Sequence, residues 1–128
     1  MINKKDSIPR VSISENAIDI LKKVKEEHGL VMFHISGGCC DGSSPMCLSE
    51  GELFVGEQDL YLGLVEDCGV YIAKTTFRYY ENMYIHIDAV EGRGASFSLE
   101  IPLGYRFILA SSLIDDTDLD KVQKPMNC

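Results

Sequence analysis

Residues 12–35, SISENAIDILKKVKEEHGLVMFHI, contain the change of hydrophobic period that decides the fold class. In the first part of this stretch, apolar residues recur at helical spacing, and lysines and glutamates occupy the opposite face. Ser14 is the expected N-cap, and Ser12 with Glu15 offers an alternative capping box. Gly29 is placed as a C-terminal glycine should be, so we expect one helix from Ser14 to residue 28.

Beyond the helix the pattern changes to the two-residue period of strands. Strands are expected at residues 30–35, 52–55, 60–65, 70–73, 84–90, 95–101 and 105–109. Residues 75–82 lack alternation, which favours a short helical crossing. One helix followed by many short strands is typical of the α+β class. We therefore predict an N-terminal helix packed on a mostly antiparallel sheet of short strands. The residues expected to be buried are Ile18, Leu21, Val24, Phe33, Ile85, Ile87, Phe97 and Leu99.

Length and charge define the rest of the organisation. The 128 residues suit one globular domain, expected at 11–114, after a lead at 1–10 and before a loose, polar, acidic tail at 115–128. The formal net charge of −8 disfavours nucleic acid and anionic membrane surfaces as partners. We find no apolar signal segment or run of membrane-spanning length, so a cytoplasmic location is expected. Thiols stay reduced there, which favours ligand or catalytic roles for cysteines.

Three of the five cysteines lie within residues 36–47, SGGCCDGSSPMC. We interpret this stretch as a glycine-rich loop that follows a strand and turns the sulfurs of Cys39, Cys40 and Cys47 toward a common target. Thiolates suit zinc, copper(I) or iron–sulfur chemistry, and they also suit disulfide exchange. The spacing contains no CxxC and matches no standard zinc signature. Because adjacent cysteines bind one ion only with strain, we expect one of Cys39 and Cys40 to act with Cys47 and a histidine.

Two histidines are candidates for that ligand. His34 lies on the strand that leads into the cysteine loop, and His86 alternates with apolar residues on a later strand, sharing a face with Asp88. If the two strands are neighbours, both imidazoles can reach the loop. The competing interpretation for each is a hydrogen-bonded, half-exposed strand histidine. Cys68, between Asp67 and Gly69, is expected in a turn with a structural role.

The chain resembles the domain-of-unknown-function 779 family over Val11 to Asp116, most closely in residues 36–47 and in Gly92-Arg93-Gly94-Ala95-Ser96-Phe97-Ser98-Leu99-Glu100. The resemblance implies a small bacterial protein whose gene often neighbours aldehyde dehydrogenase genes. It brings no established activity.

A fainter resemblance is to the HesB-like A-type iron–sulfur carriers, in the Gly-Gly-Cys loop and in the pattern Gly-x-Gly-x-x-Phe-x-Leu-Glu-x-Pro that begins at Gly92. In that family a cysteine after two glycines acts with a C-terminal Cys-Gly-Cys to hold iron or a cluster across a dimer. Cys39 or Cys40 matches the first position. The C-terminal pair is absent, since Tyr105 follows Gly104 where cysteines would stand.

These observations predict a non-enzymatic, metal-binding or iron–sulfur-type accessory protein that serves an oxidoreductase, by family resemblance an aldehyde dehydrogenase. The expected cofactor is iron, zinc or an iron–sulfur cluster, with ligands among Cys39, Cys40, Cys47, His34 and His86. One alternative is a thiol redox protein in which Cys39 or Cys40 attacks and Cys47 resolves. Another is a binding module or small enzyme whose cysteines are structural. The aromatic segment 77–84 and the HesB-like resemblance predict a homo-oligomer.

Overall fold

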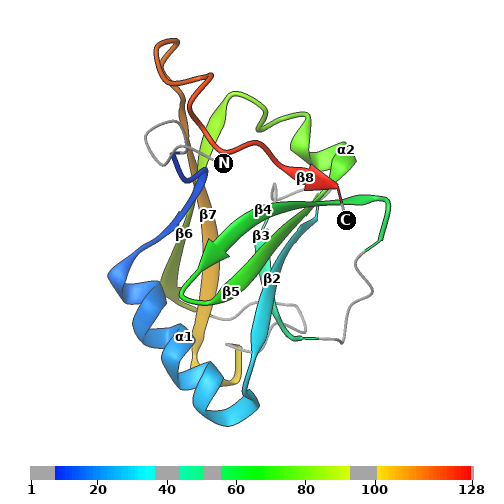
Figure 1. Cartoon of the computed structure of the whole chain (residues 1–128). Coiled ribbons are helices and arrows are strands. Elements are labelled where there is room, and N and C mark those ends of the chain that lie inside the picture. Colours follow the sequence, from blue (N-terminus) through cyan, green and yellow to red (C-terminus); the bar gives the residue numbers. More distant parts are fainter. Residues whose placement is uncertain (1–7, 37–43, 51–55, 93–100, 128) are drawn as a thin grey trace.

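A computed structural model describes residues 8–36, 44–50, 56–92 and 101–127 (Figure 1). The helices are α1 (Glu15–His28), α2 (Lys74–Phe77) and the 3-10 turn η2 (Ile101–Leu103). The strands are β1 (Val11–Ile13), β2 (Val31–Ser36), β3 (Ser44–Ser49), β4 (Asp59–Val65), β5 (Cys68–Ala73), β6 (Met83–Glu91), β7 (Tyr105–Leu113) and β8 (Met126–Asn127). The fold is mixed α+β with one main helix, as the sequence predicts. Within these ranges, no helix has the length and apolar character needed to cross a membrane.

Helix α1 has the limits that its sequence indicates. The Ser14 hydroxyl oxygen accepts a hydrogen bond from the Ala17 amide at 3.2 Å, and Gly29 closes the helix at φ 76°, where its amide bonds to the Lys25 carbonyl. Glycine is favoured at such a φ because it has no Cβ to clash. The buried stripe of the helix is Ala17, Ile20, Leu21 and Val24. Burial of each large aliphatic side chain is worth about 1.5–3 kcal/mol, so this stripe attaches the helix to the sheets.

The prediction of a single sheet led by a helix is wrong in two respects. Strand β1 precedes the helix and pairs in parallel with β6. The strands form two sheets, one of three strands in the order β1-β6-β7 and one of five in the order β3-β2-β5-β4-β8. The β2–β5 pair is also parallel, whereas the other four pairs are antiparallel. Parallel pairing joins strands that are distant in sequence, which the local hydrophobic period does not encode.

The two sheets pack face to face around one core. Phe33 of β2 meets Phe107 of β7 edge to face, with ring centroids 5.0 Å apart. Alternate residues of each strand point into this core, including Ile35, Ile72 and Ile87. The expected burial of Leu21, Val24, Phe33, Ile85 and Ile87 is confirmed. Ile18 is only half-buried, because it stands beside the buried stripe of α1, and Phe97 and Leu99 lie outside the described residues.

The sequence predicts a loop through residue 47, but in the structure residues 44–49 form strand β3. It forms an antiparallel hairpin with β2, in which Ser36 pairs with Ser44 and Val31 with Ser49. Pro45 and the serines gave this segment the composition of a loop. A proline is tolerated here because β3 is at the edge of its sheet among the described strands, and prolines in sheets are confined to edge strands and similar positions.

The other expected strands within the described residues are present, although their limits shift. Cys68 opens β5 and is fully buried, so the expected turn position for it is wrong. Glu66 and Asp67 make the turn, with φ of 46° and 65°. The crossing at 75–82 is one short helix, α2, followed by turns. Residues 52–55 and 95–100, also expected as strands, lie outside the described residues.

The acidic tail is attached to the domain, in contrast to the loose segment that its composition indicates. Val122 is buried and forms a bridge with Ile8, and β8 pairs with Leu60 and Tyr61 of β4. A charged segment stays disordered when it cannot bury enough apolar surface to offset the entropy lost on ordering. Here Val122 supplies buried apolar surface.

Candidate functional site

The cysteine segment connects two described strands. Residue 36 ends β2 and residue 44 begins β3, so residues 37–43 join the two strands of one hairpin. Cys39 and Cys40 belong to this connection and lie outside the described residues. The hairpin therefore defines where their segment leaves the sheet and where it returns.

Cys47 lies in the core of the molecule. It pairs with Phe33 across the hairpin, and its side chain is fully buried in the same cluster as Phe33 and Ile35. Successive side chains of a strand point to opposite faces. Cys47 therefore lies on the inner face of the five-stranded sheet and His34 on the outer face, so the structure does not bring these two predicted ligands together.

His34 forms a close pair with Asp59 on the outer face. The Nε2 atom of His34 is 2.8 Å from Oδ1 of Asp59, and the side chains are only 12% and 13% exposed. Because an ionised carboxylate accepts hydrogen bonds and cannot donate them, the proton of this bond belongs to Nε2. The Nδ1 atom of the neutral ring is then the one that carries a lone pair. The carboxylate thus selects the tautomer of His34 and its orientation.

Asp59 was not singled out as a functional residue. Its position after Gly56 is typical of a turn, and its Oδ2 atom does accept a hydrogen bond from the Gly56 amide at 3.3 Å. The other oxygen faces His34 because Asp59 pairs with Ala73 of β5, and β5 lies directly between β4 and β2. Only the order of the strands brings the two residues together. The sequence signal for Asp59 is only that of a turn aspartate just before an expected strand.

A surface hollow opens beside this pair. It has a volume of about 490 Å³. Its walls come from the end of β2, from the turn before β4 and from the junction of β5 with α2, and the lining residues are His34, Glu57, Gln58, Asp59, Ala73, Lys74 and Thr75. Carboxylate, imidazole and ammonium groups therefore meet at one opening.

His86 lies on the other sheet. Its Nδ1 atom is 2.7 Å from the Ser12 hydroxyl oxygen, between the paired strands β6 and β1. Since β6 and β2 belong to different sheets, His34 and His86 are not on neighbouring strands as the two-histidine hypothesis requires. Among the described residues, no cluster of three or more histidine, cysteine, aspartate or glutamate side chains is arranged to hold a metal ion.

Asp88 shares the face of His86, as the alternation predicts. The Ser14 hydroxyl donates to Asp88 Oδ1 at 2.5 Å, and the Ala89 amide donates to the same oxygen at 2.8 Å. These hydrogen bonds, first that of Ser14 and then that of Ala89, lower the pKa of Asp88 below its ordinary value. These hydrogen bonds connect the N-terminus of α1 to β6, so Asp88 has a structural role.

Burial raises the pKa of the Cys68 thiol, chiefly because its charged form is desolvated. A protonated, fully buried thiol is a poor nucleophile and a poor ligand. The structural role predicted for Cys68 agrees with this environment.

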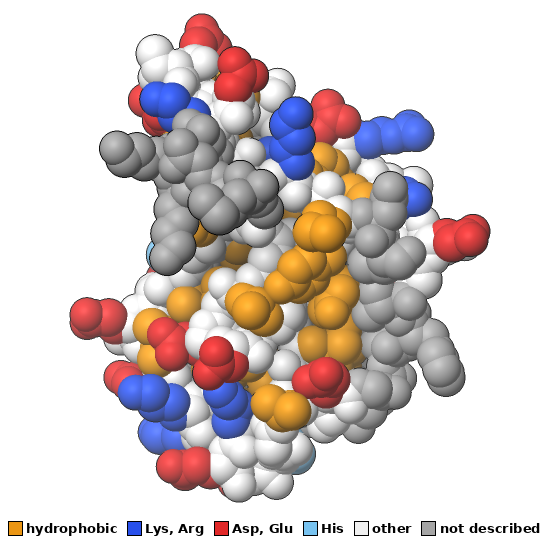
Figure 2. Space-filling model, in the orientation of Figure 1, with side chains coloured by type: hydrophobic (Ala, Val, Ile, Leu, Met, Phe, Trp, Pro, Cys, Tyr) orange, Lys and Arg blue, Asp and Glu red, His pale blue; other side chains and the backbone are white. Residues whose placement is uncertain are grey.

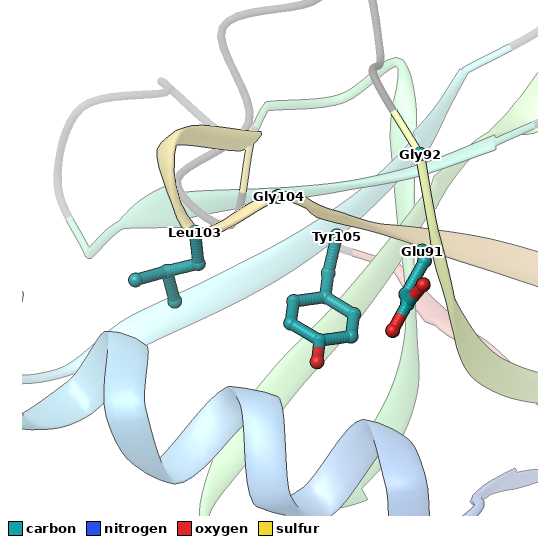
Figure 3. Close-up of a pocket in the computed structure, with 5 residues that line it drawn as sticks. All are labelled: Glu91, Gly92, Leu103, Gly104 and Tyr105. Carbon is teal, nitrogen blue, oxygen red and sulfur yellow. The ribbon is translucent and has the colours of Figure 1, made fainter.

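A second hollow lies where β6 and β7 approach η2. Its lining residues are Glu91, Gly92, Leu103, Gly104 and Tyr105. Figure 3 shows the Tyr105 ring directed toward α1, with the Glu91 carboxylate beside it. The sequence of this region carried the glycine motif that begins at Gly92, but residues 93–100 of the motif lie outside the described residues.

A protein-family model identifies the family of this chain. The model of the domain of unknown function DUF779 matches residues 20–113. The chain belongs to the DUF779 family. The matched range includes His34, Cys39, Cys40, Asp59 and His86, so both the cysteine loop and the His34–Asp59 pair lie within the family domain.

The chain was also compared with curated proteins and with solved structures. No curated protein matches the sequence. A solved structure that resembles this DUF779 chain is SufA from Escherichia coli, a protein involved in the biosynthesis of iron–sulfur clusters. The likeness has a TM-score of 0.45 and 15% identity, and it covers 88% of this chain and 95% of SufA. A similarity at this level carries no argument about activity.

Proposed function

We propose that this DUF779 protein is a non-enzymatic, cytoplasmic metal-binding accessory protein of the HesB-like type. Its ligands are a thiolate from Cys39 or Cys40 and the Nδ1 atom of His34. The observation that carries the proposal is the 2.8 Å hydrogen bond between His34 Nε2 and Asp59 Oδ1. Metal-binding histidines almost always donate their other ring N–H to a carboxylate, a backbone carbonyl or water, which orients the ring and raises its basicity.

Chain connectivity supports the pairing of His34 with the cysteine loop. Ser36 is two positions after His34, which is about 7 Å at the rise of a strand, and the cysteine segment begins at the next residue. A thiolate and an imidazole together suit zinc or iron better than they suit the hard cations magnesium and calcium. The proposal gives no ligand role to Cys47, which points into the core, or to His86, which lies on the other sheet.

The proposed partners are an aldehyde dehydrogenase and further copies of this chain. The family's gene neighbourhood favours an aldehyde dehydrogenase as the protein served. A homo-oligomer built through the segment 77–84 is supported by Tyr79, whose side chain is 78% exposed. Aromatic side chains so exposed are common at protein interfaces. Light scattering of the purified protein measures the oligomeric state.

Metal analysis of protein purified without oxygen tests the site. We expect stoichiometric zinc or iron in the parent and its loss when Cys39 and Cys40 are both replaced by serine. His34→Ala should weaken metal affinity, and Asp59→Asn should weaken it about 10–100-fold, because the tautomer and orientation of His34 are no longer held. Affinity should also fall at low pH, since protons compete for thiolate and imidazole.

Matched controls are Cys68→Ser and His86→Ala, which should keep the metal content of the parent. The proposal is overturned if the Cys39, Cys40 double variant keeps the same bound metal. A parent that carries no metal and takes up neither zinc nor iron also overturns it, and thiol titration of that protein then tests the redox alternative with Cys39 or Cys40 and Cys47.

A further inference from the structure

The outer face of the five-stranded sheet carries a continuous row of apolar and aromatic side chains. The register aligns Met46, His34, Tyr71, Tyr61 and Met126, one residue from each of β3, β2, β5, β4 and β8. Four interstrand spacings of about 4.8 Å make this row roughly 19 Å long. The rings of Tyr61 and Tyr71 lie against each other with centroids 5.4 Å apart, so the middle of the row is a contiguous aromatic surface.

Large apolar residues in this row and beside it are open to solvent. Leu64 of β4 is 64% exposed, Met126 is 59% exposed, and Leu30, just before β2, is 60% exposed. Figure 2 shows hydrophobic side chains gathered over β4 and β5, in the orientation of Figure 1. We call the residues Leu30, Met46, Tyr61, Leu64, Tyr71 and Met126 the apolar face. Exposed apolar surface that is contiguous marks an interaction site more often than scattered exposed residues do.

The margin of the apolar face is mainly acidic. Glu66 and Asp67 form the turn next to Leu64, and the Glu50 amide bonds to the Leu30 carbonyl at one end of the sheet. Glu57 stands beside His34 and Asp59 at the other end. Basic groups are also present: Lys74 lies in the hollow beside Glu57, the Lys25 ammonium group donates to the Glu66 carbonyl, and exposed Lys124 stands two residues before Met126. Acidic side chains thus flank both ends of the face.

From this arrangement we infer that the apolar face docks a segment of another protein, one with alternating apolar and Lys or Arg side chains. The apolar side chains of the segment cover Tyr61, Leu64 and Tyr71. Its basic side chains meet the carboxylates of Glu57, Glu66 and Asp67. A second copy of this chain is a poor occupant, because a two-fold contact would bring each acidic margin against the other. The inference does not require a bound metal.

Peptide binding followed by amide NMR tests the inference on the full chain. The probe is the synthetic peptide Ac-KLKVKLKV-NH2, and its acidic counterpart Ac-ELEVELEV-NH2 is the matched comparison. We expect the basic peptide to bind and to shift amides of β2, β4 and β5, and the acidic peptide not to bind. Affinity should fall as ionic strength rises from about 0.05 to 0.5 M, because salt screens exposed charges.

Variants separate the apolar and charged contributions. Leu64→Ser should weaken binding about tenfold, the loss expected for one large apolar contact. The combination Glu57→Gln, Glu66→Gln and Asp67→Asn should weaken binding and reduce its dependence on salt. Leu113→Ser is the matched control, since Leu113 is 73% exposed on β7 of the other sheet, and it should bind like the parent.

Three results would overturn the inference. The first is equal binding of the two peptides, and the second is a set of shifted amides confined to β6 and β7. The third is a parent dimer that Leu64→Ser converts to monomer, because a second copy would then cover the face. Since metal content is measured separately, loss of peptide binding and loss of the metal site are distinguishable.

Discussion

At the scale of single residues, the environment of a side chain determines its chemistry more than its type does. Cys47 and Cys68 are buried in the core, whereas Cys39 and Cys40 belong to the segment between β2 and β3. His34 is oriented by a carboxylate and His86 by a hydroxyl. The sequence pattern grouped Cys47 with Cys39 and Cys40, and His86 with His34, whereas it set Cys68 apart; the structure gives Cys47 a buried environment like that of Cys68.

Asp88 provides a test at this scale. Its folded-state pKa is depressed by the hydrogen bonds from Ser14 and Ala89, so its stabilising contribution is present above the unfolded-state pKa of about 3.9 and is lost as pH falls through the folded value. We expect the urea midpoint of the parent to fall more steeply than that of Asp88→Asn as pH is lowered from about 5 to 3.

The control for that experiment is Asp116→Asn, because Asp116 is exposed in the acidic tail. This variant should follow the acid dependence of the parent. Parallel curves for the parent and Asp88→Asn would contradict the role assigned to Asp88.

At the scale of elements, Arg10 links segments that lie far apart in the chain. Arg10, just before β1, is 6% exposed and donates from Nη1 to the carbonyls of Tyr80, Glu81 and Met83 and from Nε to that of Gln123. Its guanidinium group also lies 5.3 Å from the centre of the Phe77 ring. Burial lowers the pKa of Arg10, but the group remains charged. One side chain thus joins the turn before β6 to the C-terminal segment.

Arg10→Met should destabilise the fold by about 2–4 kcal/mol, because it removes four part-buried hydrogen bonds to backbone carbonyls. Arg10→Lys should recover only part of this loss, since one ammonium group cannot reproduce the planar set of donors. Urea unfolding at neutral pH measures both. Arg106→Met, at an exposed position of β7, is the matched control and should change the midpoint little. Equal midpoints for Arg10→Met and the parent would contradict the role given to Arg10.

At the scale of the whole molecule, the segment before β1 and the C-terminal segment bind to each other, and the C-terminal segment also pairs with β4. The bridge between Ile8 and Val122, the bond from Arg10 to Gln123 and the β4–β8 pair all involve residues after 114. Figure 1 shows the C-terminal segment running back along the molecule to β4. The tail is therefore part of the folded unit, although most of its residues are polar.

Removal of residues 118–128 should lower the free energy of unfolding by about 2–4 kcal/mol, from the lost burial of Val122 and the lost acceptor of Arg10. Removal of residues 125–128 alone, which takes away β8 and leaves Val122, should cost less. Denaturant unfolding of the three chains measures the difference. Equal stability of the parent and the 118–128 deletion would show that the tail is not part of the cooperative unit.

Features that depend on neighbours along the chain can be predicted without the structure. The limits of α1, its buried stripe, the α+β class and most described strands follow from hydrophobic period and from caps that act within one turn. The position of His34 on the strand that leads into the cysteine loop is likewise a fact of sequence. Membership of DUF779 also follows from the sequence, because the family model matches residues 20–113.

Only the tertiary structure decided which strands are neighbours. The division into two sheets, the parallel β1–β6 and β2–β5 pairs and the contact of His34 with Asp59 depend on residues far apart in the chain, and no local period records such pairing. The same order of strands aligned Met46, Tyr71, Tyr61 and Met126 into one surface and separated His34 from His86. The register of the β2–β3 hairpin put Cys47 on the opposite face from His34. A strand pattern tells which side chains share a face; the free energy of packing the two sheets decides what that face meets.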